Sequence, residues 1–236
     1  MTTVLAINGS ARMEKGDTHK VLTALLEGMK EEHAEVETIF AKRLKIRPCL
    51  GDFHCWYEKV GKCIQKDDME SLLPKLRETE ILVLAIPIYF PLPGEMQNLL
   101  NRLMPLVEPI LEFREGRTRA KFHDDVKISK IVLVSTGGWW EKENMDLVVQ
   151  FVEHMANDAD VEFSGAILRP HAFLMDKYKE KADEILGATK SAGAQLIKEG
   201  KMSKDTLEVI SQPLESEKDL RDWYNKTYQK AKESSS

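Results

Sequence analysis

Short apolar runs alternate with amphipathic helical patterns along most of this chain, and this alternation constrains the fold more than any other feature. The runs typical of strands are residues 2–8, 36–41, 80–90, 130–138 and 162–170. The third run, EILVLAIPIYF, is almost continuously apolar, as expected for a parallel strand covered on both faces. We therefore expect an α/β fold, a flavodoxin-like doubly wound parallel sheet of five strands in the order 2-1-3-4-5, with helices on both faces.

Apolar residues recur at helical spacing between and after these runs. The helices that this spacing predicts are residues 17–33, 67–79, 94–111, 144–158 and 177–200, with short helices in the tail at 205–210 and 220–232. Asp67 and Glu70 have the N-cap and N3 spacing of a capping box, which predicts where the second helix begins. We expect one domain over residues 1–200 with a cysteine-containing insertion at 47–66, and a helical C-terminal extension of the same domain at 201–236.

The composition narrows the class of protein. The chain has 236 residues and 42% hydrophobic residues, enough for a buried core. Its net charge of −5 offers no basic surface to a polyanion, so we expect no nucleic-acid partner. The N-terminus lacks the pattern of a secretory signal, and no apolar run approaches the ~20 residues of a membrane span. We therefore expect a cytoplasmic protein without a membrane partner.

The candidate binding site follows from the sheet order. In open α/β sheets, ligands bind beyond the carboxyl ends of the strands where the strand order reverses, which here selects the loops after the first, third and fourth strands. The first loop, NGSARMEKGDTHK, combines hydroxyls of Ser10 and Thr18, the guanidinium of Arg12 and a helix N-terminus, a set that suits a phosphate monoester. The alternative is an ordinary turn capped by Asp17. The sequence lacks the endings of a P-loop and of a dinucleotide-binding G-x-G-x-x-G.

The other two loops carry aromatic side chains. Tyr89 and Phe90 stand between prolines in PIYFPLPGEMQN, and Trp139 and Trp140 follow two glycines in STGGWW. These side chains offer flat surfaces to a planar ring, although core packing is an equally reasonable interpretation for either tryptophan. A ligand with both a phosphate and a planar ring satisfies the three loops together. FMN fits this description.

These loops resemble those of the flavodoxin-like NAD(P)H-dependent FMN reductases, in the branch related to the iron–sulfur flavoproteins, from the first strand to about Ala156. GSARMEKGDT is similar to the family's phosphate loop G-S-P-R-x-x-G-N-T, with two substitutions and one extra residue. The family's P-x-Y segment, which lies along the flavin ring, appears as residues 87–89, and its later D-R pair appears as Asn101 and Arg102. The cofactor-binding residues that we expect are Ser10, Arg12, Thr18, Pro87, Ile88, Tyr89, Phe90, Thr136, Gly137, Gly138 and Trp139.

All three cysteines lie in CLGDFHCWYEKVGKC, residues 49–63, too few for a disulfide framework. Relatives show C-x2-C-x2-C-x7-C before D-D-M, and Cys49, Cys55 and Cys63 fall on this frame with Asp52 in the place of the second cysteine. A [4Fe–4S] cluster normally takes four thiolates. We favour a segment without a stable metal, serving as a wall of the crevice or a subunit contact. A cluster completed by Asp52, or zinc with His54 or Asp52, stays open.

The resemblance implies an FMN-dependent oxidoreductase. FMN takes a hydride from NADH or NADPH, and a small-molecule or protein acceptor (a quinone, a flavin, ferric iron or an electron carrier) receives the electrons. Backbone amides after Tyr89 and Gly137 are expected to stabilise negative charge on the reduced ring. Relatives form homodimers or homotetramers. The alternatives are an iron–sulfur flavoprotein electron carrier and a non-catalytic FMN-binding module.

Other titratable residues give weaker hypotheses. Asp67 and Asp68 are candidates for paired acids in proton transfer, but the capping box accounts for them without chemistry. His123 and His171 each follow or precede a strand, and a role in the binding pocket is a hypothesis for both. Hydrolysis is not expected, because no Ser-His-Asp or Cys-His arrangement stands out.

Overall fold

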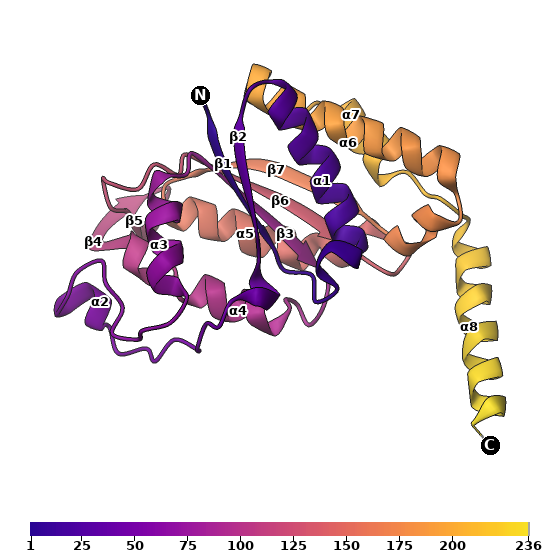
Figure 1. The fold of residues 1–236 in the computed structure, drawn as a ribbon, viewed down its shortest axis with the longest axis horizontal. Helices are drawn as coiled ribbons and strands as arrows, with labels where there is room; N and C mark the ends of the chain where they lie inside the picture. Colours follow the sequence, from indigo (N-terminus) through magenta and orange to yellow (C-terminus); the bar gives the residue numbers. More distant parts are fainter. Residues whose placement is uncertain (236) are drawn as a thin grey trace.

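The computed structural model describes residues 1–235 and contains a five-stranded parallel sheet in the order β2-β1-β3-β6-β7 (Figure 1). In chain order this is the predicted order 2-1-3-4-5, and the flavodoxin-like prediction is confirmed. The strands are β1 (Thr3–Asn8), β2 (Glu35–Phe40), β3 (Ile81–Pro87), β6 (Lys130–Thr136) and β7 (Glu162–Arg169). The central strands β1, β3 and β6 are buried almost throughout, as their apolar runs predict.

Helices cover both faces of the sheet. They are α1 (Asp17–Glu31), α2 (His54–Tyr57), α3 (Met69–Glu78), α4 (Gly94–Asn101), α5 (Asp146–Asp158), α6 (Lys179–Glu199), α7 (Lys204–Ser211) and α8 (Glu217–Ser234). Helices α1, α6 and α7 pack in one core on one face, while α3, α4 and α5 pack in a second core on the other (Figure 1). No helix of residues 1–235 is both long enough and apolar enough to cross a membrane.

Helices α1 and α6 approach each other at two glycines. A Cβ at Gly28 would stand 1.8 Å from the carbonyl oxygen of Lys190, and one at Gly193 would stand 2.0 Å from that of Leu25. Neither position therefore accepts a side chain at this helix spacing. This contact fixes α1, whose N-terminus follows the first candidate loop, against α6.

The predicted helix at 94–111 is wrong in its second half. Helix α4 ends at Asn101, and after a 3-10 turn the chain forms an antiparallel hairpin of β4 (Val107–Arg114) and β5 (Arg117–Phe122). Pro105 and Pro109 lack the backbone N–H that a helix needs, which explains why the apolar spacing there does not continue as a helix.

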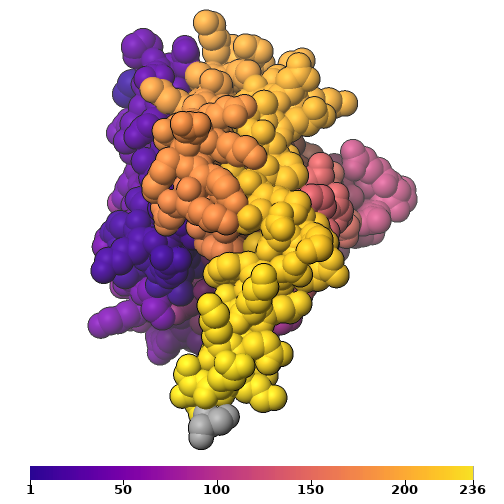
Figure 2. Space-filling view, turned by 90° about the vertical axis from the view of Figure 1, so that its right-hand side faces the viewer, coloured from indigo at the N-terminus to yellow at the C-terminus, as the bar shows by residue number. Residues whose placement is uncertain are grey.

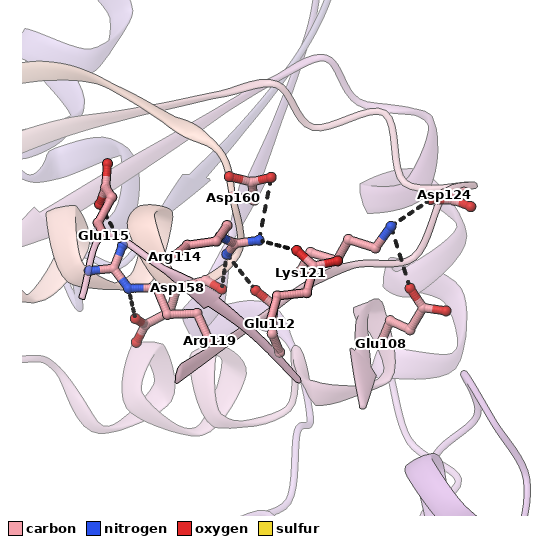
Figure 3. A network of polar contacts seen from close by, with 10 residues as sticks. Glu108, Glu112, Arg114, Glu115, Arg119, Lys121, Asp124, Asp158 and Asp160 are labelled. Atoms are coloured by element: carbon pink, nitrogen blue, oxygen red, sulfur yellow. Dashed lines mark hydrogen bonds and ion pairs between the residues drawn. The ribbon is translucent and has the colours of Figure 1, made fainter. Parts of the chain in front are cut away.

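Ion pairs hold this hairpin to the end of α5 and to the turn that follows it. Figure 3 shows Arg114 between Glu112 and Asp160, and Arg119 between Glu115 and Asp158, with N···O distances of 2.9 to 3.6 Å. The hairpin is thus tied to the domain by charges. Its apolar side chains Ile110, Leu111 and Phe113 are more than half exposed.

The C-terminal tail forms a longer helix than predicted. Helix α8 has 18 residues, begins at a Ser216 N-cap whose hydroxyl accepts from the Asp219 N–H, and buries Leu220. Glu217 and Asp222 are half-buried and the other residues are exposed, and the far half of the helix extends beyond the body of the molecule (Figure 1).

Candidate functional site

Three loops meet at the carboxyl edge of the sheet, as the topology predicts. The Gly9 N–H donates to the Ala85 carbonyl at 2.8 Å, and the Ile88 N–H donates to the Thr136 carbonyl at 2.9 Å. The hydroxyls of Thr18 and Thr136 are 2.7 Å apart. These bonds hold the loops after β1, β3 and β6 against one another at this edge of the sheet, and the expected cofactor-binding residues belong to these loops. We call this meeting point of the three loops the crevice.

The first loop ends at a helix start that has no side-chain cap. The N-cap of α1 is Gly16, so the alternative of a turn capped by Asp17 is wrong. The buried Ser10 hydroxyl accepts from the Arg12 N–H at 3.3 Å, and the Ser10 N–H donates to the side chain of Asn8 at 2.8 Å. First-turn N–H groups at an uncapped helix start form a site for an anion.

The charges around this helix start are balanced. The Asp17 carboxylate lies 3.0 Å from the Lys20 ammonium and 3.4 Å from the Arg12 guanidinium. Arg12 keeps 66% of its side chain exposed, so it is able to turn toward an anion at low cost. Thr18 is 2% exposed and its hydroxyl faces Thr136, which leaves it at most two further hydrogen bonds.

The second loop presents its aromatic side chains to solvent. Tyr89 is 49% exposed and Phe90 is fully exposed, in contrast to the buried strand before them. The Tyr89 N–H donates to the Pro91 carbonyl at 3.0 Å. Among residues 1–235 the next amide, that of Phe90, has no acceptor and is available to a ligand.

In the third loop the two tryptophans differ. Trp139 is 66% exposed and lines a hollow with Tyr224 and Asn225 of α8, whereas Trp140 packs against the core and donates from Nε1 to the Glu215 carbonyl at 2.9 Å. The packing interpretation therefore holds for Trp140. The Gly137 N–H is taken by the Arg169 carbonyl, and within the described chain the Gly138 N–H has no acceptor.

Neither histidine hypothesis places its residue in the crevice. His171 is fully buried after β7, where Nε2 accepts from the Leu214 N–H at 3.0 Å. Burial and the neighbouring Arg169 lower the pKa of His171 to about 4, so the ring is neutral. His123 lies in the segment that leads into β6, at the amino-terminal edge of the sheet, away from the crevice.

Arg169 is a buried cation that sequence reasoning missed. It is fully buried, and its guanidinium donates to the carbonyls of Pro170 and Ile210 at 2.8 and 2.7 Å and contacts His171 Nε2 at 3.2 Å. Within residues 1–235 it contacts no carboxylate. Burial lowers the pKa of Arg169 to about 10. Ile210 lies 41 positions away in α7, a contact for which the sequence carries no local signal.

The cysteine segment is held by Asp67 and Asp68. Asp67 accepts hydrogen bonds from the N–H groups of Arg47 and Met69, and Asp68 accepts from the Lys45 N–H. The predicted capping box is wrong, since Asp68 and not Asp67 is the N-cap of α3 and this helix start has no side-chain cap hydrogen bond. Neither aspartate lies near the crevice loops, and the hypothesis of a catalytic acid pair finds no support.

The three cysteines line one cavity of about 410 Å³ together with Asp52 and Arg102. Cys49 is exposed, and burial with the nearby Cys63 raises the pKa of Cys55. The Asp52 carboxylate accepts a hydrogen bond from the His54 N–H at 3.1 Å through Oδ1, and its second oxygen has no hydrogen-bond partner within residues 1–235. In residues 1–235, no three His, Cys, Asp or Glu side chains are placed to hold a metal ion.

The comparison with protein families agrees with this site. The model of the NADPH-dependent FMN reductase family matches residues 2–139, more than half of the chain, and the chain belongs to this family. The matched region contains the first two loops and the third loop as far as Trp139. It ends before β7 and the C-terminal extension.

Individual relatives match parts of the chain. An iron–sulfur flavoprotein of Methanocaldococcus jannaschii is 34% identical over 104 residues, 44% of this chain and 52% of the relative. This chain thus spans about half the length of the curated relatives that it matches.

Two solved structures share the fold. An FMN-dependent NADH-azoreductase from Bacillus anthracis in complex with FMN has a TM-score of 0.58 at 14% identity, covering 84% of this chain and 100% of its own. An NAD(P)H:quinone oxidoreductase from Methanothermobacter marburgensis has a TM-score of 0.58 at 15% identity, covering 83% of this chain and 98% of its own.

Proposed function

We propose that this protein binds FMN non-covalently and oxidises NADH or NADPH. The observation that carries the proposal is the crevice itself, where an uncapped helix N-terminus with Ser10 and Arg12 stands beside the exposed rings of Tyr89, Phe90 and Trp139. Large exposed aromatics gathered at one edge of an otherwise buried sheet are typical of a ligand site. Membership of the FMN reductase family supports the same ligand.

The donor set fits FMN at both of its ends. The helix start, the Ser10 hydroxyl and the Arg12 guanidinium suit the dianionic phosphate. The remaining cofactor-binding residues expected from the sequence surround the flavin in the proposal, namely Thr18, Pro87, Ile88, Tyr89, Phe90, Thr136, Gly137, Gly138 and Trp139. The amides of Phe90 and Gly138 serve as donors for the polar edge of the ring. When bound, FMN supplies hydride and electron transfer.

The acceptor that we propose is a small molecule such as a quinone, a free flavin or ferric iron, or a protein electron carrier. The azoreductase and quinone oxidoreductase share only the fold, and their substrates enter here as support for a small acceptor. A cytoplasmic setting is part of the proposal, because three free cysteines suit a reducing compartment.

A homodimer or homotetramer also belongs to the proposal. Ile110, Leu111 and Phe113 leave exposed apolar surface on the β4–β5 hairpin, which the ion pairs of Figure 3 tie to the domain. We place the contact between copies of this chain there.

A second candidate is an iron–sulfur flavoprotein electron carrier. It is favoured by curated relatives of that name and by three cysteines that line a single cavity. The side chains of this structure are not arranged as a metal site, and we assign no step to a cluster.

The test is anaerobic purification without added cofactor, followed by the visible spectrum, flavin and iron analysis, and NADH and NADPH oxidation with a quinone acceptor. Bound FMN with turnover supports the reductase. About four irons per chain with slow nicotinamide oxidation supports the carrier. FMN binding without turnover by either nicotinamide supports the binding module, and a protein that refuses added FMN overturns all three.

A further inference from the structure

The C-terminal helix α8 contacts the third crevice loop. The phenol of Tyr224 donates a hydrogen bond to the carbonyl oxygen of Gly138 at 3.1 Å, across 86 positions of sequence. Figure 2 shows α8, in yellow, running down this face of the molecule beside the segment that follows β6. Since the family match ends at residue 139, Tyr224 is a contribution from outside the matched region.

The Tyr224 hydroxyl is held in place by its own packing. The ring lies 5.0 Å from that of Trp223 and 6.0 Å from that of Phe173, centroid to centroid. Leu220, one turn earlier on α8, is 3% exposed and anchors this end of the helix in the core. The hydrogen bond to Gly138 therefore comes from a fixed donor.

This bond sets the orientation of one peptide unit. In a trans peptide the C=O and the N–H point in opposite directions. With the Gly138 carbonyl held toward α8, the N–H of Trp139 in the same unit points away from α8. A glycine at this position leaves the unit easy to rotate, and the Tyr224 hydroxyl removes that freedom.

We propose that Tyr224 is a positioning residue for the flavin, because it locks the Gly138–Trp139 peptide with its N–H available to the polar edge of the ring. The inference rests on the proposed function, since it requires FMN at this loop. A fixed N–H donor stabilises a negatively charged acceptor more than a neutral one. Tyr224 therefore favours the reduced, anionic form of FMN over the oxidised form.

The first test is Tyr224→Phe, which removes the hydroxyl and keeps the ring packing. Dissociation constants are measured for oxidised FMN and, under anaerobic conditions, for dithionite-reduced FMN. We expect reduced FMN to bind about fivefold to tenfold more weakly and oxidised FMN about twofold, the effect of one hydrogen bond. Tyr228→Phe is the matched control, because Tyr228 is 65% exposed one turn further along α8.

A second pair of variants tests the contact from the other side. A Cβ at Gly138 would lie 3.2 Å from the Tyr224 hydroxyl, so Gly138→Ala disturbs this bond. We expect Gly138→Ala to weaken binding of reduced FMN in the wild-type background and to have a smaller effect when combined with Tyr224→Phe.

Three outcomes with the variants overturn the inference alone. Equal weakening of both redox forms in Tyr224→Phe means that the residue only supports the fold, and unchanged binding means that the peptide is oriented by other contacts. Additive effects of Gly138→Ala and Tyr224→Phe likewise contradict it. Failure of the wild-type protein to bind FMN appears before any variant is made, and it overturns the proposed function together with this inference.

Discussion

Arg102 and Asp67 form a two-pronged ion pair that is almost closed to solvent. The two Nη–Oδ distances are 2.8 and 3.2 Å, and the side chains are 1% and 5% exposed. The same guanidinium donates to the Arg47 carbonyl at 2.8 Å. It thus joins the end of α4, the start of α3 and the entry to the cysteine segment, so these contacts help to order this segment.

Removing the cation of this pair is expected to destabilise the protein strongly. Arg102→Ala leaves the buried Asp67 carboxylate without its partner, and we expect a loss of about 3–5 kcal/mol in the free energy of unfolding by urea. Arg47→Ala is the control, since its guanidinium is 61% exposed at 3.8 Å from Asp67 and such pairs contribute about 0–1 kcal/mol. Equal losses in the two variants would contradict this account.

The ion pair also predicts that the stability of the protein falls at acid pH. Burial alone raises the pKa of Asp67, but hydrogen bonds from Arg102, Arg47 and Met69 outweigh it and hold the pKa below its usual value. A carboxyl with a lowered folded pKa stabilises the protein above its unfolded pKa of about 3.9, and this contribution is lost as the pH falls through the folded value. The stability gap between wild type and Asp67→Asn should therefore be largest near neutral pH and shrink below about pH 4.

The neutral His171 predicts a second pH effect in a different range. With a folded pKa of about 4, its contribution is present above the unfolded value of ~6.5 and is lost as the pH falls toward 4. The loss in the free energy of unfolding is on the order of 3 kcal/mol. In urea unfolding, the free energy of unfolding of His171→Gln should fall less between pH 7 and pH 4.5 than that of the wild type. His33→Gln, at an exposed turn, should follow the wild-type curve.

The phosphate end of the site is tested by comparing two flavins. Arg12→Ala should weaken FMN binding about tenfold, the scale of one charge-assisted hydrogen bond, and leave riboflavin binding unchanged because riboflavin has no phosphate. Lys15→Ala removes a charge of the same sign from the same loop and is expected to have a smaller effect on FMN. A parallel loss for both flavins would place Arg12 away from the phosphate.

The exposed face of the β4–β5 hairpin predicts self-association. Leu111→Ser and Phe113→Ser are expected to shift sedimentation velocity profiles toward the monomer, because both remove apolar area from an exposed patch. Leu147→Ser on α5 is the control, since Leu147 is 62% exposed outside the hairpin. An unchanged profile for the hairpin variants, or an equal shift for the control, would place the contact elsewhere.

The sheet could be predicted because each strand is marked by the residues of its own short segment. Each central strand is a short apolar run, and in a parallel sheet buried on both faces such a run has no competing interpretation once helices flank it. The hairpin at 107–122 was missed because its first strand continues the apolar spacing of α4, and only the two prolines mark the change. The crevice loops followed from the strand order, which fixes where the chain turns.

Side-chain contacts between residues far apart in the sequence could not be predicted. Asp67 has the spacing of a capping residue, yet its carboxylate forms an ion pair with Arg102, 35 positions away. A buried carboxylate is stabilised more by a buried cation than a helix is stabilised by a side-chain cap. Tyr224 and Gly138 lie at a greater separation still. The pattern around each residue carries no information about such a partner.

The contact between Arg169 and Ile210 forms late in the synthesis of these residues. The Arg169 guanidinium is made 41 residues before the Ile210 carbonyl that accepts from it, and chains emerge from the ribosome N-terminal end first. Until α7 has been synthesised, the last strand of the sheet carries a cation with no place to be buried. The nascent chain therefore satisfies this buried cation only after α7 has been made, and a shortened chain that stops after α6 would leave the Arg169 guanidinium at the end of β7 without the Ile210 carbonyl.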